Sequence, residues 1–404
     1  MLVTRGKITT ITQRDGVSCQ SLEDPFALLQ QVLYSCDDTS SAGLPFCGGA
    51  LGYFSYDLAR RIEKLPERAI DDQHLPEMAI GVYEWAYIAD HLERRSWLAG
   101  RRSSDLEECW AALVEQFRSP QQRKPRHPFT TIASPISDTG EMAYQEAFAS
   151  IKHYLREGDC YQVNYARRFT GRVTGDPFDG YCRLRRLNSA PFSAYLNLPF
   201  AQILSSSPER FIRVVDQQVE TRPIKGTRAR SADPLLDKEL AEELRNSHKD
   251  RAENVMIVDL LRNDLGKSCV AGSVRVPELF AVESYATVHH LVSTITGKLR
   301  DDRDVLDLLR GAFPGGSITG APKRRAMEII EELEPYRRGI YCGSIGYIGF
   351  DGQMDTNIAI RTLVHRAGEV HFWAGGGIVI DSDMQSEFQE TQHKAAGMLR
   401  LFES

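Results

Sequence analysis

The sequence predicts an α+β fold, because strand-like and helix-like segments both occur along the chain but do not alternate strictly. Short apolar runs such as Gln202 to Ser205 and Phe211 to Val215 are typical of strands. A strictly alternating order would instead favour a doubly wound parallel sheet. The chain has 404 residues, 42% of them hydrophobic, so it can bury one very large core or two ordinary ones.

Helices are predicted mainly in the second half of the chain. Tyr144, Phe148, Ile151 and Leu155 recur at helical spacing, and Gly158 provides a stop signal. A proline in the first turn supports one of the later helices. The further helices are expected at Leu235 to Arg245, Asp250 to Arg262, Pro322 to Leu333 and Met384 to Phe402.

Residues 119–137 contain four prolines and a basic cluster without helical or alternating periodicity, which predicts a linker. It would separate a β-rich N-terminal part, residues 1–118, from a larger part, residues 138–404. The segments Gly48 to Asp57 and Cys342 to Asp351 resemble each other, and both are expected to be glycine-marked strands.

Composition excludes several classes of function. The formal charge is −6, from 49 basic and 55 acidic residues without a basic block, so nucleic acid is not expected as a partner. No apolar run reaches the roughly 20 residues that span a bilayer, and the first residues do not resemble a signal peptide. Eight scattered cysteines without a C-x-x-C pair indicate reduced thiols and a cytoplasmic protein. A small anionic substrate would need local cations or a metal.

Two predicted helices carry acidic residues that could serve a site. Glu253 shares a helical face with Ile257 and Leu261, so it is either an ion-paired structural residue or a ligand. Glu387 and Glu390 lie on one stripe with Lys394, which on an arbitrary helix would be a solvated face with one ion pair. If both helices face one cavity, their carboxylates predict a magnesium site.

Two glycine-rich segments and one lysine have alternative interpretations. The segments Phe313 to Lys323 and Ala374 to Ile378 match no nucleotide-binding motif, but their backbone amides could bind a carboxylate. Tight turns that need positive φ would explain each equally well. Lys225 alone would be interpreted as a surface lysine, although burial beside other cations or in an apolar pocket would make its amine a nucleophile.

Together these segments closely resemble the chorismate-utilising enzymes, the family of anthranilate, aminodeoxychorismate, isochorismate and salicylate synthases. The resemblance extends from about Phe46 to the C-terminus, and its motifs are long and specific. They are Ser207 to Phe211, Arg222 to Thr227, Arg251 to Asn254, Leu261 to Asp264, Val288 to Leu291, the two glycine-rich segments, Ile360 to Thr362 and Glu387 to Thr391.

The resemblance implies large antiparallel sheets packed as a sandwich with flanking helices. It also implies a set of site residues. Glu253 and Glu390 would hold Mg²⁺ on the ring carboxylate of chorismate, with Glu387 in support. The implied substrate-binding residues are Arg361, Tyr347 and the amides of Gly375, Gly376 and Gly377 at the enolpyruvyl carboxylate, Lys394 near the ring carboxylate and Thr319 in the first glycine-rich segment. His290, beside the reacting ring, is expected to be catalytic.

Two positions separate the members of this family. Anthranilate synthases have alanine at the position of Lys225, whereas aminodeoxychorismate synthases have lysine. Isochorismate and salicylate synthases carry a water-activating lysine at the position of Gln162, so Gln162 argues against water as the nucleophile. We therefore expect Lys225 to attack C2 of chorismate while Glu209 protonates the departing C4 hydroxyl, after which ammonia attacks C4.

The resemblance also implies partners and alternatives. No cysteine lies in a G-x-C-x-G elbow, so ammonia is expected from a separate glutamine amidotransferase subunit. Relatives usually have a few dozen more residues before the segment that matches Ile8 to Gln31. Those residues help to form a pocket the size of tryptophan, and the segment Phe46 to Asp57 matches part of the same pocket. Tryptophan is therefore a further possible ligand. The alternatives are an anthranilate synthase, and a non-catalytic subunit that binds chorismate or tryptophan.

Overall fold

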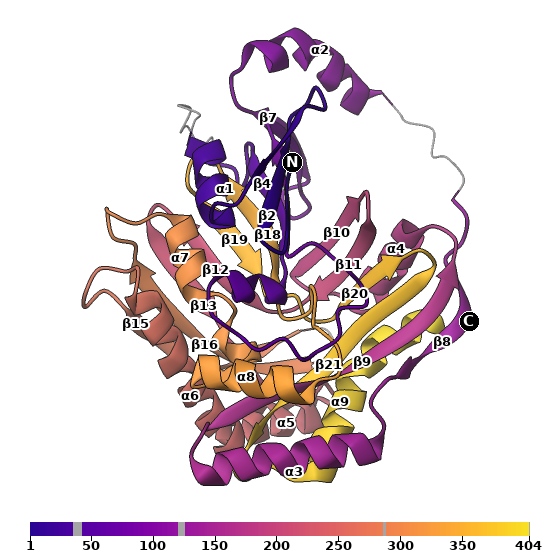
Figure 1. The fold of residues 1–404 in the computed structure, drawn as a ribbon, viewed down its shortest axis with the longest axis vertical. Coiled ribbons are helices and arrows are strands. Elements are labelled where there is room, and N and C mark those ends of the chain that lie inside the picture. The colour runs from indigo at the N-terminus through magenta and orange to yellow at the C-terminus, as the bar shows by residue number, and fades with distance from the viewer. Residues whose placement is uncertain (35–42, 120–125, 286–287, 404) are drawn as a thin grey trace.

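The computed structural model describes residues 1–34, 43–119, 126–285 and 288–403. Within these residues, two large antiparallel sheets form the body of the molecule, with helices around them (Figure 1). The α+β sandwich expected from the sequence is thereby confirmed. The N-terminal residues and α2, at the top of Figure 1, lie far from the base that α3 forms.

The larger sheet combines strands from both ends of the chain. One end of it is formed by β14 and β15, which both pair with β16, and its far end by the first three strands. In spatial order it comprises β14 (Ile224–Ala229), β16 (Val288–Lys298), β13 (Gln218–Arg222), β12 (Arg210–Val215), β19 (Met354–Asn357), β18 (Ser344–Gly349), β4 (Gly49–Phe54), β5 (Met78–Tyr83), β1 (Leu2–Arg5), β2 (Ile8–Thr12) and β3 (Ser18–Ser21), with β15 (Arg275–Ser284) paired to β16.

The smaller sheet is built around one long antiparallel pair, β21 and β9, which are in register over eleven residues. It faces the larger sheet across an apolar layer that includes Tyr53 and Ile345 from one sheet and Ile203 and Val364 from the other. In spatial order it comprises β10 (Phe192–Leu198), β11 (Ala201–Ser207), β20 (Thr362–Arg366), β21 (Glu369–Val379), β9 (Gln162–Thr174) and β17 (Gly320–Ala321), with β8 (Thr130–Ser137) paired to β9.

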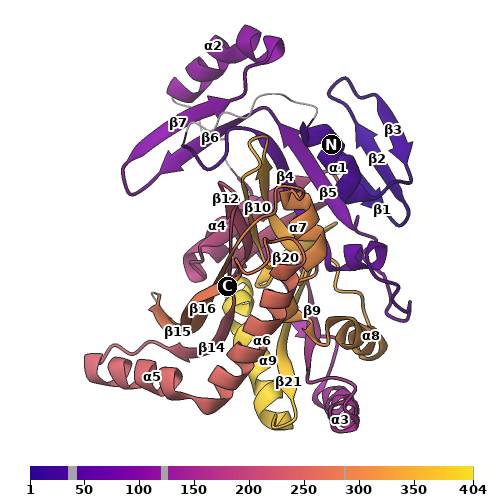
Figure 2. The same cartoon turned by 90° about the vertical axis from the view of Figure 1, so that its left-hand side faces the viewer.

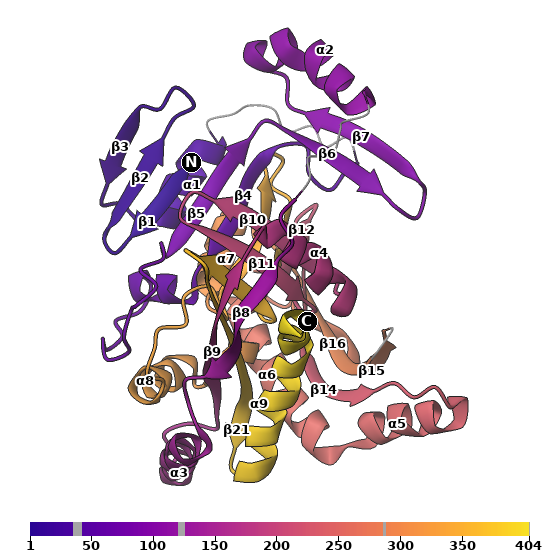
Figure 3. The same cartoon turned by 90° about the vertical axis from the view of Figure 1, so that its right-hand side faces the viewer.

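The helices cover the outer faces and one end of the sandwich. In Figure 3, α9 lies along β21, with α3 beyond its lower end, whereas Figure 2 shows α5 projecting from the base. A hairpin of β6 (Trp85–Asp90) and β7 (Arg95–Gly100) stands apart with α2. The helices are α1 (Pro25–Tyr34), α2 (Ser104–Arg118), α3 (Glu141–Glu157), α4 (Pro177–Leu187), α5 (Pro234–Asn246), α6 (His248–Gly266), α7 (Val305–Ala312), α8 (Lys323–Leu333) and α9 (Met384–Leu399), with 3-10 turns at η1 (Tyr56–Arg61), η2 (Gly316–Ile318) and η3 (Arg400–Phe402).

The two segments with similar sequences are neighbouring strands. β4 and β18 pair antiparallel, and Gly52 lies opposite Gly346. A Cβ on Gly52 would collide with the carbonyl oxygen of Ala79, and one on Gly346 with that of Asp355. Glycine is needed at both positions because a neighbouring backbone approaches closely, as expected for glycine-marked strands.

The boundary between the two expected parts differs from the prediction in two respects. Residues 130–137, expected in the linker, form β8, which pairs with β9 although Pro135 interrupts its register. A proline is tolerated there because β8 is an edge strand. In addition, strands of residues 1–118 and of residues 138–404 share the larger sheet through the β4–β18 pair. The rest of the expected linker includes residues 120–125, which lie outside the described residues.

Two further expectations concern the environment of the chain. In the described ranges, no helix combines the length and apolarity needed to cross a membrane. The cysteines of these ranges are all free, and Cys36 lies outside them.

Candidate functional site

Lys225 lies on the edge strand β14 at a bulge. The pairing of β14 with β16 shifts register between Lys225 and Thr227, and Gly226 between them has φ +76°. A bulge of this kind redirects the neighbouring side chains. The Lys225 side chain is half-buried, and its Nζ donates a hydrogen bond to the carbonyl oxygen of Ser317 at 3.2 Å. Lys225 is therefore held within the molecule rather than free on its surface.

Glu209 lies between β11 and β12 and is 5% exposed. Its Oε1 accepts a hydrogen bond from the hydroxyl of Ser317 at 2.8 Å. Burial raises the pKa of Glu209, and this effect outweighs the Ser317 hydrogen bond and the ammonium groups of Lys225 and Lys394, which lower it. A buried carboxyl with a raised pKa beside a lysine is a candidate general acid. Ser317 thus contacts both expected catalytic groups.

The carboxylate of Glu253 on α6 lies within electrostatic range of those on α9. A Cβ on Gly376 would lie 3.3 Å from Glu387 Oε2 and 3.4 Å from Glu390 Oε1. Burial raises the pKa of Glu253, and the charges of Glu387 and Glu390 raise it further, whereas Lys225 and Lys249 oppose the shift. The three glutamates expected to form a metal site are therefore electrostatic neighbours.

Lysines serve as counter-ions to these glutamates. Lys249 Nζ lies 3.2 Å from Glu387 Oε1, which also accepts a hydrogen bond from the Ser382 hydroxyl at 2.7 Å. Lys394 Nζ lies 2.6 Å from Glu390 Oε1. Burial alone would raise the pKa of Glu390, but Lys394 and Lys249, together with Lys225, lower it.

The donor set suits a hard cation. The candidate ligands are all carboxylate oxygens, which Mg²⁺ prefers, and Gly376 leaves space in front of two of them. Among the described residues, no three His, Cys, Asp or Glu side chains already lie close enough to hold a metal together. A metal would bind Glu387 and Glu390 in competition with their lysine partners, and water and substrate oxygens would supply further ligands.

The second glycine-rich segment is part of a strand, so its interpretation as a tight turn with positive φ was wrong. Residues 374–378 lie within β21, paired with β9, and Gly375 and Gly377 stand opposite Ala166 and Asn164. The amides of Ala166 and Asn164 point away from β21. The Ala166 amide donates to Glu334 Oε1, and the Asn164 amide donates to the Thr319 carbonyl. Residues that lie opposite each other in an antiparallel pair point their backbone groups either both towards each other or both away. The amides of Gly375 and Gly377 therefore point away from β9.

That outward side of β21 has no strand beside it over the glycines in the described structure. β20 pairs with β21 only from Glu369 as far as Phe372. The amides of Gly375 and Gly377 therefore lie beyond the end of β20. The Gly375 carbonyl on this side accepts a hydrogen bond from Lys394 Nζ at 3.1 Å. The amides can therefore still meet a carboxylate, although from a strand edge and not from a loop.

Arg361 directly precedes β20, at the same end of the sheet. It has φ +49°, which is uncommon for a residue with a side chain. Its half-buried guanidinium has no ion-pair partner among the described residues, and burial lowers its pKa. A desolvated cation without a counter-ion is a favourable place for an anion.

His290 is 3% exposed, and its Nδ1 lies 2.9 Å from the Thr227 hydroxyl. Burial, followed by the charge of Arg361, lowers the pKa of His290 to about 4. The imidazole is therefore neutral near pH 7 and borders Arg361.

Two expected site residues make other contacts. The Tyr347 ring packs on Phe46 with 5.2 Å between centroids, and burial raises its pKa to about 12, with charged neighbours Asp355, Arg213 and Arg210. The buried Thr319 hydroxyl donates to the Gly315 carbonyl at 3.0 Å, so it stabilises its own loop.

Sequence reasoning missed Ser317 and Lys249 as members of the site. Nothing in the glycine-rich segment indicates which hydroxyl faces Glu209. Gln162 was used only to exclude water, yet it is fully buried and both its amide atoms lack a hydrogen-bond partner in the described structure. A Cβ on Gly377 would collide with its amide, so Gln162 lies against the glycine run. Buried amides normally have partners, and a ligand could supply them here.

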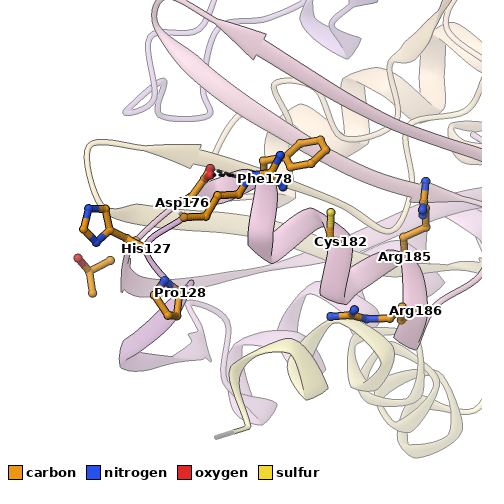
Figure 4. A pocket seen from close by; sticks show the side chains of 10 residues that line it. His127, Pro128, Asp176, Phe178, Cys182, Arg185 and Arg186 are labelled. Carbon is orange, nitrogen blue, oxygen red and sulfur yellow. Dashed lines mark hydrogen bonds and ion pairs between the residues drawn. The ribbon is translucent and has the colours of Figure 1, made fainter. Parts of the chain in front are cut away.

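A wide, open hollow is formed by a different set of residues (Figure 4). It is lined by Phe178, Cys182, Arg185 and Arg186 of α4 and by the chain around His127 and Asp176. None of the expected site residues is among the ten that line it. We therefore do not assign the reaction to this hollow.

Comparisons with known proteins agree with the sheet architecture and the motifs. The family model described as chorismate binding enzyme matches residues 4–400. Aminodeoxychorismate synthase component 1 of Escherichia coli K12 is 50% identical over 404 residues, which cover 100% of this chain and 87% of that protein. Anthranilate synthase component 1 of Thermus thermophilus is 40% identical, with 98% of this chain and 88% of that protein covered.

A solved structure shares the fold. The crystal structure of anthranilate synthase component I from Streptococcus pneumoniae TIGR4 matches with a TM-score of 0.86 and 32% identity, covering 99% of this chain and 92% of that one. The described strands, the neighbouring glutamates and the full-length matches lead to one conclusion. The chain belongs to the family of chorismate-binding enzymes.

Proposed function

We propose that this enzyme aminates chorismate at C4 to give 4-amino-4-deoxychorismate, a precursor of p-aminobenzoate and folate, through an intermediate bound to Lys225. The observation that carries the proposal is the linkage of Lys225 and Glu209 through Ser317, which sets a nucleophile and an acid side by side. The 50% identity with a protein named aminodeoxychorismate synthase component 1 supports the same reaction.

Chorismate would be held by its two carboxylates. Arg361 has no counter-ion in the described chain, and the Gly375 and Gly377 amides face the same end of the sheet, so they would bind the enolpyruvyl carboxylate. Lys394 would lie near the ring carboxylate, and neutral His290 beside the ring. Tyr347, whose ring packs on Phe46, would contribute to the same carboxylate site.

Glu253 and Glu390, supported by Glu387, would hold Mg²⁺ at the ring carboxylate. Bound magnesium would polarise that carboxylate and favour departure of the C4 hydroxyl. The all-oxygen donor set and the space in front of Gly376 support this assignment.

The reaction would consist of two allylic displacements. The Lys225 amine forms a bond to C2, both ring double bonds shift by one position, and the C4–oxygen bond breaks as Glu209 gives its proton to the leaving hydroxyl. The attached nitrogen is then a secondary ammonium. Water is released. Ammonia then forms a bond to C4, both double bonds return to their original positions, and the C2–nitrogen bond breaks, so that Lys225 leaves as its amine. The new C4 ammonium gives one proton to the Glu209 carboxylate, which regenerates the enzyme.

Ammonia would come from a separate glutamine amidotransferase. The relatives are named component 1, which implies a second component. We also propose a cytoplasmic location for the enzyme, with its cysteines reduced. Tryptophan is a further candidate ligand at the Phe46–Tyr347 pair, and calorimetric titration with tryptophan tests it, with Phe46→Ala expected to weaken binding.

The decisive assay is turnover of chorismate with ammonium and magnesium, with the product identified by mass spectrometry and NMR. Nitrogen at C4 supports the proposal, and nitrogen at C2 would instead identify an anthranilate synthase. Chorismate binding without turnover would indicate a non-catalytic subunit.

The covalent step has its own test. Intact-protein mass after incubation with chorismate and magnesium, without ammonia, should show an adduct that maps to Lys225. Lys225→Ala should abolish both the adduct and most activity, whereas Lys238→Ala, which changes an exposed lysine on α5, should leave both unchanged. Full activity of Lys225→Ala would refute covalent catalysis.

A further inference from the structure

The loop of residues 313–322 between α7 and α8 meets both proposed reacting groups through one residue. Ser317 is buried, its hydroxyl donates to Glu209 Oε1 at 2.8 Å, and its carbonyl accepts from Lys225 Nζ at 3.2 Å. The side chain and the backbone of one residue therefore set the positions of two groups that come from different parts of the larger sheet.

The base of this loop is closed by a buried ion pair. Lys323, the first residue of α8, lies with its Nζ 2.7 Å from Asp264 Oδ2 on α6, and the same Nζ donates to the Ala312 carbonyl at 2.7 Å. Ala312 ends α7, so Lys323 joins the two ends of the loop. The Asp264 side chain is 2% exposed, and Lys267 binds its other oxygen at 2.9 Å.

The middle of the loop is held by a second buried ion pair. Arg338 and Glu334 are 1% and 3% exposed in their side chains and lie 2.7 Å apart. Arg338 Nη1 donates to the carbonyl of Ile318, the residue after Ser317, at 3.0 Å. Arg338 Nη2 also donates to the Asn164 carbonyl on β9 at 2.6 Å, so this pair links the loop to the strand that carries Gln162.

We propose that Ser317 is a positioning residue for both displacements: its hydroxyl occupies Oε1 of Glu209, so that the acidic proton is carried by Oε2, and its carbonyl directs Lys225. This inference rests on the proposed function and deepens it. The loop is fixed at its base and in its middle, so Ser317 does not depend on substrate to reach this position. Prior orientation of this kind lowers the barrier because the reacting groups need not search for their geometry.

The role predicts a change in the pH profile that loss of packing alone would not produce. Among the described residues, Lys225 on β14, Lys394 on α9 and Cys342 before β18 interact electrostatically with Glu209. The Ser317 hydrogen bond stabilises the Glu209 carboxylate and so lowers its pKa. Without this hydroxyl the pKa of Glu209 rises further, and the basic limb of kcat moves to higher pH.

The test compares Ser317→Ala, Ser317→Thr and Ser317→Cys in the full chain, with Ser150→Ala on α3 as the matched control. We expect Ser317→Ala to form the Lys225 adduct roughly tenfold to a hundredfold more slowly, with little change in the chorismate KM and with the basic limb shifted upward. Ser317→Thr should restore both the rate and the limb, and Ser317→Cys, a weak donor of similar size, should restore them only in part.

Several outcomes would overturn the inference. An adduct rate within twofold of wild type in Ser317→Ala, or a slower rate with an unmoved basic limb, excludes the positioning role. If Ser317→Ala does not fold, Ser317→Cys and Ser317→Thr provide the test. Equal rates of adduct formation and equal kcat–pH profiles in these two variants would show that the strength of the hydrogen bond is irrelevant. Failure of the proposed function is distinguishable, since wild type itself would then form no adduct.

Discussion

His290 is a buried imidazole whose pKa is lowered to about 4, first by burial and then by the Arg361 charge. The unfolded chain binds a proton near pH 6.5, whereas the folded chain binds it only near pH 4. Stability is therefore unaffected by this group above about pH 6.5 and is progressively lost as the pH falls towards 4. The loss is on the order of 3 kcal/mol for a shift of this size.

His290→Gln should remove this dependence. The free energy of unfolding, measured in urea from about pH 7 to about pH 4.5, should fall less steeply in the variant than in wild type. The difference between the two proteins in free energy of unfolding isolates the contribution of His290. It removes the contribution of buried carboxyls such as Glu209, whose raised pKa increases stability as the pH falls. Parallel curves for the two proteins would show that His290 does not titrate as described.

Arg361 illustrates a conflict between stability and binding at a single residue. Its guanidinium is desolvated without a counter-ion among the described residues, which costs folding free energy. Arg361→Met should therefore raise the melting temperature while it raises the chorismate KM, with the stability gain amounting to about 1 kcal/mol. Calorimetry and initial rates measure the two effects. A variant that is less stable, with an unchanged KM, would contradict both parts.

At the scale of elements, the sequence predicts helices better than it predicts the role of glycines. The expected helix around Tyr144 is α3, which ends at Glu157 with Gly158 in the left-handed region, because apolar spacing and a glycine stop are local signals. Pro322 was expected inside the first turn of α8 but caps it, a shift of one residue. The run Gly375 to Gly377 has no side chains to show alternation, so its strand was not recognised.

The candidate site was predictable only in part for the same reason. The spacing of Glu387 and Glu390 places both on one helical face, but only the fold brings Glu253 of α6 towards them. The contact between Ser317 and Glu209 joins residues 108 positions apart, and no local pattern encodes it. The motifs of the family supply such pairings. The role that they imply for Tyr347 stays a prediction, and its ring packs on Phe46.

The glycine run of β21 leads to a prediction for the element as a whole. Successive residues of a strand face opposite sides, so a methyl group on Gly376 would enter the space in front of Glu387 and Glu390. Gly376→Ala should weaken Mg²⁺ binding, measured by calorimetry, with little change in stability. Gly375→Ala would place its Cβ 2.5 Å from the Tyr165 carbonyl oxygen and should mainly destabilise the fold.

Gly140→Ala, at the start of α3 where nothing lies within 4 Å of a Cβ, is the control for both changes. It should alter neither magnesium affinity nor melting temperature. Equal magnesium affinity in Gly376→Ala and Gly140→Ala would remove the glutamate pair from the metal site.

At the scale of the molecule, the larger sheet makes the two halves of the chain interdependent. β18 pairs with β19 on one side and with β4 on the other, from Ser344 opposite Phe54 to Gly349 opposite Gly49. The division into residues 1–118 and 138–404 that the proline-rich segment suggested therefore does not correspond to separate sheets. Composition signals a connection, but it does not show which strands pair across it.

A fragment of residues 126–404 should therefore not fold alone. Removing residues 1–125 would leave β18 as an exposed edge with a row of unpaired amides and carbonyls, and it would uncover apolar residues of the layer between the sheets such as Ile345. We expect this fragment to aggregate, and co-expression with residues 1–119 to restore a soluble complex with chorismate affinity. Size-exclusion chromatography and near-UV circular dichroism measure this. A monodisperse fragment with a cooperative thermal transition would show instead that residues 126–404 are an independent domain.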